Sequence, residues 1–308
     1  MNASSPKYKV SVIITCYNYG RYLTEAVESV EANTLAEVEI IIVDDGSPEP
    51  YTQQVVNKYK EEGYHVICQT NQGVARARNN GIRAASGSYI LPLDADNKLA
   101  REHLAHAVAI LEEKPNVGVV YGNAQLFGTA DQLWRNRPLP IDQMILDNQI
   151  DTCAVFRREV WEAAGGYDDQ APINTWQDWI FWMDVLIKTD WDFYHLDETT
   201  FYYRSHDASE LQKNTRKVKR KIIMREYVRT RQVALIEKAV KAGTLTAKEG
   251  LHLKKEIDLL LAYYHMEGGE LPTAYRYLYP ALTDSQLLPR SLRIATATPL
   301  KRLIKKIS

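Results

Sequence analysis

The feature that most constrains the fold is the alternation of short, apolar β-rich runs with helical stretches over residues 8–121. Two of these runs, VSVII at 10–14 and EIIIV at 39–43, are almost entirely apolar. Such runs are typical of parallel strands that are covered on both faces of a sheet. The strand–helix–strand alternation therefore predicts an α/β fold with a doubly wound, mostly parallel sheet.

The same patterns predict where the elements lie. Strands are expected at 10–15, 39–43, 64–69, 89–93, 117–121, 152–156 and 199–204, and helices at 20–32, 50–62, 74–85, 100–113 and 175–189. From about Ala208 the pattern is helical to the end. We expect a first domain over 1–207, with a nucleotide-binding half at about 8–121 and an acceptor half at about 122–207, followed by a helical region over 208–308.

Composition and charge exclude several classes of protein. The 38 basic and 39 acidic side chains nearly balance, so no nucleic-acid partner is expected. The first residues, MNASSPKYK, contain no apolar run, so no signal peptide is expected, and no stretch has the ~20 apolar residues that a membrane-spanning helix needs. The three cysteines, Cys16, Cys68 and Cys153, form no CxxC pair. These features predict a cytoplasmic protein, peripheral at most to the inner face of the membrane.

Polar residues gather where the predicted strands end. In a parallel sheet the carboxyl ends of the strands share one edge, and ligands bind there. The segments concerned are Thr15–Asn18, Asp44–Ser47, Gln69–Gly73 and Asp94–Asn97. We therefore expect one ligand site that draws on all four.

Each segment has a chemical and a purely structural interpretation. Asp94 and Asp96 can hold a hard cation that bridges a diphosphate, or can satisfy backbone donors in a turn. Asp45 can accept from a base or ribose, but Ser47 beside it can also be the N-cap of a helix. The ring of Tyr17 can stack on a base or cap the core.

Three further features lie outside the strand ends. Gly73 opens a helix that carries Arg76, Arg78 and Asn79, and such a helix start can bind phosphate or be an ordinary solvated turn. Asp178 can act as a general base or close a capping box with Thr175. His206 can be a metal ligand or a surface residue. Trp176, Trp179 and Trp182 can face a sugar ring or pack in the core.

Taken together and in this order, these segments resemble the family 2 glycosyltransferases, the inverting enzymes with a GT-A fold. The residues that carry the resemblance are VSVIITCYNYGRYL at 10–23, EIIIVDDGS at 39–47, NQGVARARNNGIRAASGSYILPLDAD at 71–96 and QDWIFW at 177–182. The resemblance covers residues 8 to about 206.

The resemblance implies a role for each residue. Thr15, Tyr17 and Asp45 match positions that hold the base, usually uracil. Asn71, Gly73 and Arg78 match the segment that lines the nucleotide and its phosphates. Asp94 and Asp96 match the pair that binds Mn²⁺ or Mg²⁺, with Asp96 the more direct ligand. Asp178 matches the catalytic base, and His206 matches a histidine near the metal and diphosphate. Gln177 and Asn97 depart from the family, which usually has acids there.

The predicted function is the inverting transfer of a sugar from a nucleotide-diphosphate sugar, UDP-linked by resemblance, to an acceptor hydroxyl in the synthesis of a cell-surface polysaccharide or glycolipid. A sugar nucleotidyltransferase is the enzymatic alternative, although CYNYGRY at 16–22 lacks the Gly- and Lys/Arg-rich loop that would hold a triphosphate. A catalytically inactive nucleotide-sugar-binding protein is the other alternative.

Two basic segments mark the helical C-terminal region. Residues 213–231 hold nine Lys or Arg against one acid, Glu226, and residues 289–308 hold six and no acid. Such segments can contact an anionic membrane surface, which suits a glycan or lipid-linked glycan acceptor. The alternatives are a solvated helix face or a homodimer contact.

Overall fold

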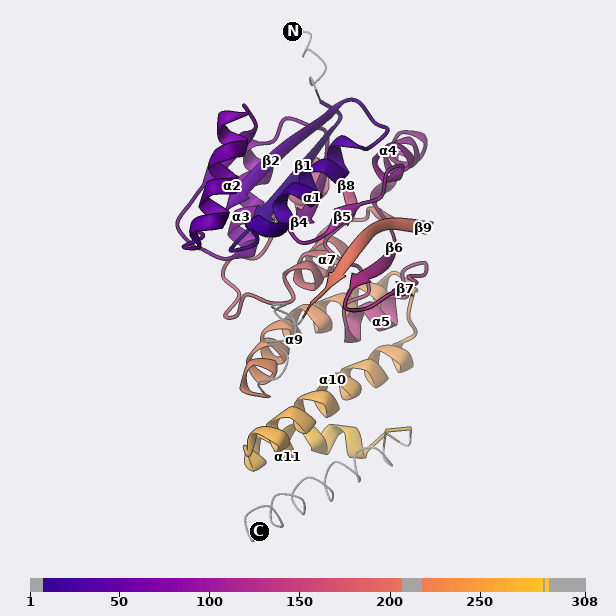
Figure 1. Cartoon of the computed structure of the whole chain (residues 1–308). Coiled ribbons are helices and arrows are strands. Elements are labelled where there is room, and N and C mark those ends of the chain that lie inside the picture. The colour runs from indigo at the N-terminus through magenta and orange to yellow at the C-terminus, as the bar shows by residue number, and fades with distance from the viewer. Residues whose placement is uncertain (1–7, 207–217, 285, 288–308) are drawn as a thin grey trace. The chain divides into compact units, whose positions relative to one another are not determined.

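The computed structural model describes residues 8–206, 218–284 and 286–287 (Figure 1). These residues form two compact units. Unit 1 takes the described residues up to 140, together with 148–170 and 176–206. Unit 2 takes 141–147, 171–175 and the described residues from 218 onward.

One sheet organises unit 1, and nine strands belong to it within the described residues. The strand order is β3-β2-β1-β4-β8-β6-β9-β5, and β7 pairs with β6. The strands are β1 (Val10–Cys16), β2 (Val38–Asp44), β3 (His65–Cys68), β4 (Tyr89–Asp94), β5 (Lys98–Leu99), β6 (Val117–Gly128), β7 (Gln132–Trp134), β8 (Val155–Arg157) and β9 (Asp192–Ser205).

The first four strands confirm the predicted parallel arrangement. β1 pairs in parallel with β2 and β4, and β2 pairs in parallel with β3. Every residue of β1 is buried, which explains why this strand is a nearly continuous apolar run rather than an alternating one.

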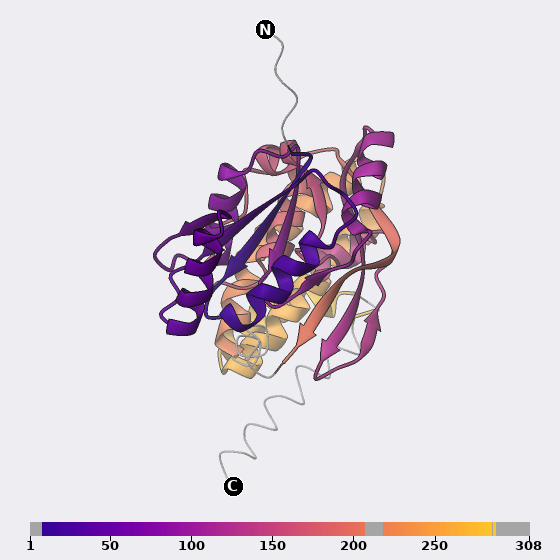
Figure 2. The same ribbon diagram turned by 45° about the horizontal axis from the view of Figure 1, so that its top comes forward.

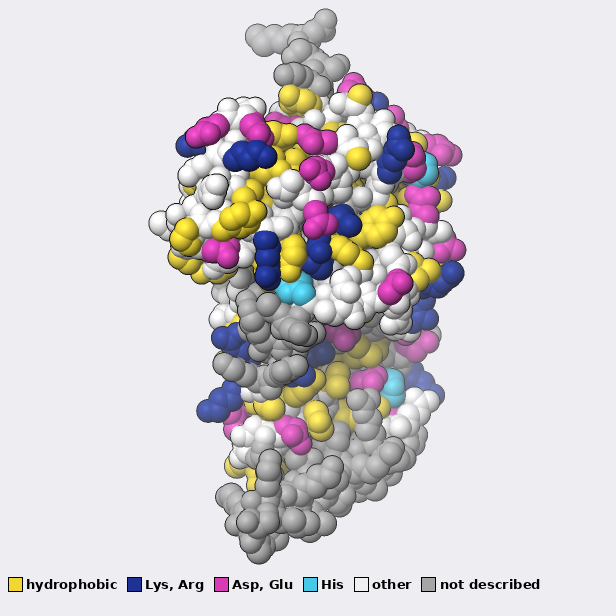
Figure 3. Space-filling model, viewed as in Figure 1, with side chains coloured by type: hydrophobic (Ala, Val, Ile, Leu, Met, Phe, Trp, Pro, Cys, Tyr) yellow, Lys and Arg dark blue, Asp and Glu magenta, His cyan; other side chains and the backbone are white. Residues whose placement is uncertain are grey.

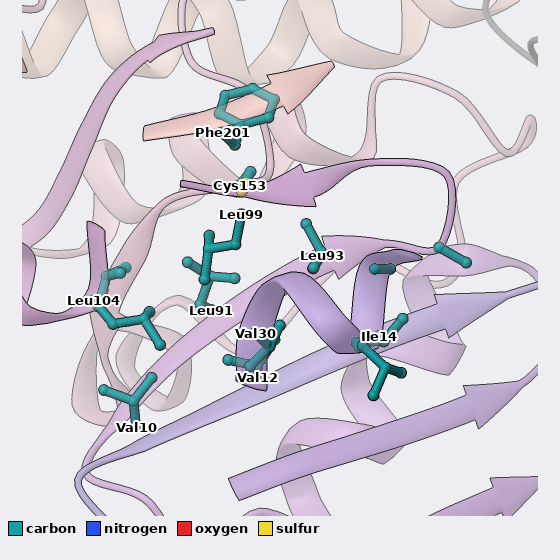
Figure 4. Close-up of a cluster of buried hydrophobic side chains, with 14 of the residues drawn as sticks. Val10, Val12, Ile14, Val30, Leu91, Leu93, Leu99, Leu104, Cys153 and Phe201 are labelled. Atoms are coloured by element: carbon teal, nitrogen blue, oxygen red, sulfur yellow. The ribbon is translucent and has the colours of Figure 1, made fainter. Parts of the chain in front are cut away.

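Helices cover both faces of this sheet. The helices of unit 1 are α1 (Gly20–Glu31), α2 (Pro50–Glu61), α3 (Val74–Ala84), α4 (His103–Glu113), α6 (Arg158–Ala164) and α7 (Gln177–Lys188). On one face, Val10, Val12 and Ile14 belong to a buried cluster with residues of α1 and α4 (Figure 4). On the other face, Gly81 lets α3 approach β1 closely, because a β-carbon at this position would lie 2.3 Å from Cγ2 of Ile13.

The second half of unit 1 differs from the expectation. The predicted strand at 117–121 continues as β6 to Gly128, and the one at 199–204 begins earlier, at Asp192, as β9. These two long strands run side by side in parallel, with register shifts between them (Figure 2). The predicted strand at 152–156 is three residues long and is antiparallel to both of its neighbours.

Unit 2 is helical, as the sequence predicts. Its helices are α5 (Ile141–Leu146), α9 (Val218–Lys241), α10 (Ala247–Gly268) and α11 (Leu271–Leu282). α10 begins with a capping box between Thr246 and Glu249 and ends at Gly269, which has a left-handed conformation. The buried ring of His265 bridges Glu226 of α9 and Glu270 before α11, with distances of 3.0 and 2.8 Å.

The surface carries both signs of charge. On the face drawn in Figure 3, acidic and basic side chains are interspersed over the described residues. Within those same residues, no helix has both the length and the apolar character needed to cross a bilayer.

Candidate active site

The ends of β1, β2 and β4 bring the predicted donor-site segments to one edge of the sheet. Cys16 is in register with Asp44, and Thr15 with Asp94. The backbone continues this alignment beyond the strands, since the Asp45 N–H donates to the carbonyl of Cys16 at 2.9 Å. Tyr17 follows at this edge with 44% of its surface exposed, so its ring is available for stacking.

Asp45 organises the loop between β3 and α3. Its carboxylate accepts the side-chain amide of Gln69 at 2.8 Å and the backbone N–H groups of Gln72 and Gly73 at 2.8 and 2.9 Å. The start of α3 therefore receives a carboxylate from the protein itself. The backbone N–H groups of Gln72 and Gly73 therefore both donate to Asp45. The roles of Asn71 and Gly73 in lining the nucleotide stay predictions.

Ser47 is not a helix N-cap, contrary to the structural interpretation of this segment. α2 begins at Pro50 with Glu49 as its N-cap. Ser47 instead joins the loops after β1 and β2: its hydroxyl donates to Asp44 and accepts the N–H of Asn18 at 2.9 Å. This pair of bonds fixes the loop that presents Tyr17.

Arg78 is buried beneath the site. Only 5% of its surface is exposed, and its guanidinium donates to Oδ1 of Asp94 at 2.7 Å. It also lies 5.4 Å from the centre of the Tyr167 ring. Arg78 is therefore held by Asp94 and packs near an aromatic ring. Its predicted phosphate contact stays a prediction.

Asp96 and His206 meet at the same edge. Nε2 of His206 lies 3.0 Å from Oδ2 of Asp96, and the His206 ring packs between Tyr19 and Tyr22 at 5.6 Å from each. Burial raises the pKa of Asp96, and the nearby charge of Asp94 raises it further.

The structure explains why position 97 is an asparagine, where the family usually has an acid. Asn97 is buried, and its side-chain oxygen accepts the backbone N–H of Arg204 at 3.0 Å. Nε of Arg204 donates in turn to the carbonyl of Asp96 at 2.9 Å. These bonds attach the end of β9, and so His206, to the turn that carries the acids.

The donor set fits a divalent cation. Asp94 and Asp96 repel each other, and a cation would relieve this repulsion. Carboxylates suit Mg²⁺ and Mn²⁺, whereas an imidazole favours Mn²⁺ over Mg²⁺. In the part of the chain that the structure describes, no three such side chains form a ready metal cluster. A cation here would have to complete its shell with diphosphate oxygens and water, as Mg²⁺ commonly does.

Asp178 lies at the start of α7 and is not part of a capping box. The residue before the helix is Trp176, in a left-handed conformation with φ of 59°, and no side chain caps it. The Asp178 carboxylate instead accepts the side-chain amide of Asn148 and the N–H of Trp179, each at 2.8 Å. The capping-box interpretation with Thr175 is therefore wrong.

The charge environment places Asp178 beside the strand-end acids. Burial raises its pKa, the charge of Asp94 adds to the increase, and Arg78 opposes it. The carboxylate therefore shares one electrostatic environment with Arg78 and Asp94. Of the nearby tryptophans, Trp179 and Trp182 are fully buried in the core, and Trp176 is partly exposed.

Sequence reasoning missed two residues of this site, Asn148 and Asp151. Asn148 holds Asp178, and Asp151 is a carboxylate whose pKa is raised to about 7 by burial and by the charges of Asp178 and Asp94. Both lie in a loop without a periodic pattern. Only the tertiary fold brings this loop to α7.

Solved structures similar to this chain are glycosyltransferases. TarS 1–349 of S. aureus, in complex with UDP-GlcNAc, is 17% identical with a TM-score of 0.59, covering 87% of this chain and 89% of that one. The mannosyltransferase PcManGT of Pyrobaculum calidifontis, with GDP-Man and Mn²⁺, is 20% identical with a TM-score of 0.55, covering 96% and 82%. The fold is therefore that of the GT-A glycosyltransferases.

The family follows from the sequence match. Residues 11–164, half of the chain, match the model described as Glycosyl transferase family 2, and this chain belongs to that family. An uncharacterized glycosyltransferase of Nostoc sp. is 32% identical over 220 residues, which are 65% of this chain. The match spans 66% of that relative, just under two thirds of its length.

Proposed function

We propose that this protein is an inverting glycosyltransferase that moves a sugar from a nucleotide-diphosphate sugar to an acceptor hydroxyl. The observation that carries the proposal is the position of Asp178. Its carboxylate is held by Asn148 at 2.8 Å and shares the electrostatic environment of Asp94 and Arg78 at the ligand-binding edge of the sheet. A base is thus available beside the acids that would hold the donor's diphosphate.

The proposed reaction is a single in-line displacement. Asp178 takes the proton of the acceptor hydroxyl, and the acceptor oxygen forms a bond to the anomeric carbon. The bond from that carbon to the diphosphate oxygen breaks, and the nucleoside diphosphate leaves with the electron pair. The raised pKa of Asp178 makes it a stronger base than an ordinary aspartate. A divalent cation at Asp96, with Asp94 and His206 nearby, would stabilise the charge on the departing diphosphate.

The proposed donor is a uridine diphosphate sugar. Thr15, Tyr17 and Asp45 are the residues proposed to contact the uracil, and the exposed ring of Tyr17 supplies a stacking surface. The complex of TarS with UDP-GlcNAc supports this choice. Because PcManGT was solved with GDP-Man, a guanosine diphosphate sugar is also included among the donors to test.

The test is a donor screen. The protein is incubated with UDP-glucose, UDP-N-acetylglucosamine and GDP-mannose, with Mn²⁺ or with a chelator, and the released nucleoside diphosphate is measured. We expect metal-dependent hydrolysis of at least one UDP-sugar. A parallel incubation with sugar phosphates and nucleoside triphosphates measures pyrophosphate. Release of pyrophosphate without donor hydrolysis would favour a nucleotidyltransferase instead.

The acceptor side of the proposal rests on the sequence. A glycan or lipid-linked glycan acceptor, a cytoplasmic location, a contact with an anionic membrane and a homodimer through the C-terminal region all stay predictions. Residues 207–217 and 288–308, which hold much of the basic sequence, lie outside the described residues. Liposome sedimentation of the full chain and of a chain truncated after Pro289 measures the membrane contact directly.

A further inference from the structure

Asp151 lies directly after a segment that is bonded to α7 at Asp178 and, one turn further on, at Trp182. Before Asp151, the side chain of Asn148 donates to Asp178, and the carbonyl of Ile150 accepts the indole N–H of Trp182 at 3.1 Å. Asp151 itself accepts the N–H of Cys153 through Oδ1 at 2.9 Å, which closes a local turn. The position of its carboxylate is therefore fixed relative to Asp178.

The mechanism proposed above gives Asp151 no role. Among the described residues, neither of its oxygens forms a salt bridge, and the bond to Cys153 uses only Oδ1. Asp178 and Asp94 are both close enough to raise its pKa. A largely buried carboxylate beside two like charges is costly, and such groups gather at functional sites.

Arg78 adds a complementary observation. It lies close enough to Asp151 to oppose that increase in pKa, and its buried Nε has no hydrogen-bond partner within the described part of the chain. The carboxylate of Asp151 and the guanidinium of Arg78 thus share one electrostatic environment. The oxygen of Asp151 that the bond to Cys153 leaves unused can accept a hydrogen bond from a hydroxyl group.

An aromatic pair lies where β9 is bonded to the turn that carries the acids, since Tyr203 precedes Arg204, which donates to Asn97 and to the carbonyl of Asp96. Burial is the main cause that raises the pKa of Tyr203, and the charges of the nearby aspartates add to the increase. The Tyr203 ring meets that of Trp134 edge-on, with 6.3 Å between centroids, and 42% of Trp134 is exposed. Aromatic surface next to hydrogen-bonding groups suits a sugar or polyol, which has apolar C–H faces between its hydroxyls.

We propose that Asp151 binds a second hydroxyl of the acceptor, next to the hydroxyl that Asp178 deprotonates. The enzyme would then prefer acceptors that present two neighbouring hydroxyls over those that present one. The second hydroxyl donates a hydrogen bond to Asp151 and stays protonated. Covalent bonds are therefore made and broken only at the first hydroxyl, the one that Asp178 deprotonates. This proposal rests on the proposed function, because it needs Asp178 to act on an acceptor.

The test compares transfer to a diol with hydrolysis by the same protein. Full-length protein hydrolyses the UDP-sugar from the screen in the presence of glycerol or of propan-1-ol at equal concentration, and the glycosylated alcohol and the free sugar are both measured. Water has no second hydroxyl, so hydrolysis serves as the internal reference. We expect the wild type to glycosylate glycerol in preference to propan-1-ol.

The decisive variant is Asp151→Asn, which can still accept the N–H of Cys153 through its amide oxygen. We expect its ratio of glycerol transfer to hydrolysis to fall about tenfold or more, as the loss of a hydrogen bond to a charged group predicts. The ratio is the readout because Asp151 belongs to the site, so the absolute rate of hydrolysis can change as well. Asp168→Asn is the matched control, because Asp168 accepts the N–H of Gln170 two residues on, at 3.0 Å, in the same kind of turn.

The outcomes separate the two proposals. An unchanged ratio in Asp151→Asn, an equal fall in Asp168→Asn, or hydrolysis without preference for glycerol would overturn the role of Asp151 and leave the glycosyltransferase proposal intact. Failure of the wild type to hydrolyse any nucleotide sugar would instead count against the proposed function.

Discussion

At the residue scale, carboxylates of one site have different surroundings and therefore different roles. Asp45 accepts three hydrogen bonds from one loop, and Asp94 holds the buried Arg78. Asp178 accepts a hydrogen bond from the side chain of Asn148, and burial raises its pKa. The first two therefore organise the site, and the third is suited to take a proton.

The role of Asp45 leads to a stability prediction. Asp45→Ala leaves the N–H groups of Gln72 and Gly73 without their acceptor, so we expect a loss of about 1–3 kcal/mol in the free energy of unfolding, together with weaker UDP binding. Thermal unfolding and titration calorimetry measure the two effects. Asp131→Ala is the control, since Asp131 is exposed and accepts from Gln125. Weaker UDP binding with an unchanged unfolding temperature would contradict this prediction, because it would mean that Asp45 contacts only the nucleobase.

The raised pKa of Asp151 predicts how stability changes with pH. Its pKa is about 7 in the folded protein and about 3.9 in an unfolded chain, so between these values the folded state binds more protons. Stability of the wild type therefore falls as pH rises through this window. An asparagine does not ionise, so Asp151→Asn does not lose stability as the pH rises through this window. Its free energy of unfolding should exceed that of the wild type above pH ~7 by roughly 1–2 kcal/mol after allowance for solvent screening.

Thermal unfolding at about pH 5 and about pH 8 checks this expectation. The advantage of Asp151→Asn should shrink at the lower pH. An advantage of the same size at both values would mean that the Asp151 carboxylate is not perturbed as described. Asp168→Asn again serves as the control for removing one carboxylate from a turn.

At the element scale, α3 links the packing of the sheet to the site. Gly81 brings the helix against β1, and Arg78, one turn earlier, reaches Asp94 from the same helix. The sequence predicted this helix and the strands beside it, because their periods and their Gly and Asp residues are local signals. It missed α6 and the three-residue strand β7, since such short elements depend on tertiary contacts.

Gly81→Ala tests this link. Alanine is favoured over glycine in a helix by about 1 kcal/mol, but the added β-carbon would lie 2.3 Å from Ile13 and overpacking costs about 1–3 kcal/mol. We expect net destabilisation and slower donor hydrolysis as Arg78 shifts. The double variant with Ile13→Ala should lose less stability than the sum of the two single variants. If the stability losses of the two single variants simply add up in the double variant, α3 and β1 are not in steric conflict at this position.

At the scale of the whole molecule, the local and the non-local parts of the fold differ in how well they could be predicted. The parallel strands β1 to β4 and the acids at their ends follow from runs and motifs in the sequence. The long pairing of β6 with β9 joins residues far apart in the chain and contains register shifts, so no periodic pattern reveals it. Asn148 and Asp151 are hidden for the same reason, because their contacts with α7 exist only in the folded chain.

The proposed mechanism depends most on Asp178 as the catalytic base, and the Asp178→Asn variant tests this role directly. Hydrolysis of the UDP-sugar and transfer to an acceptor are measured beside the affinity for UDP with Mn²⁺. We predict that turnover falls by about 10²–10⁴-fold while UDP affinity stays within about twofold of the wild type. Turnover equal to that of the wild type would contradict the account.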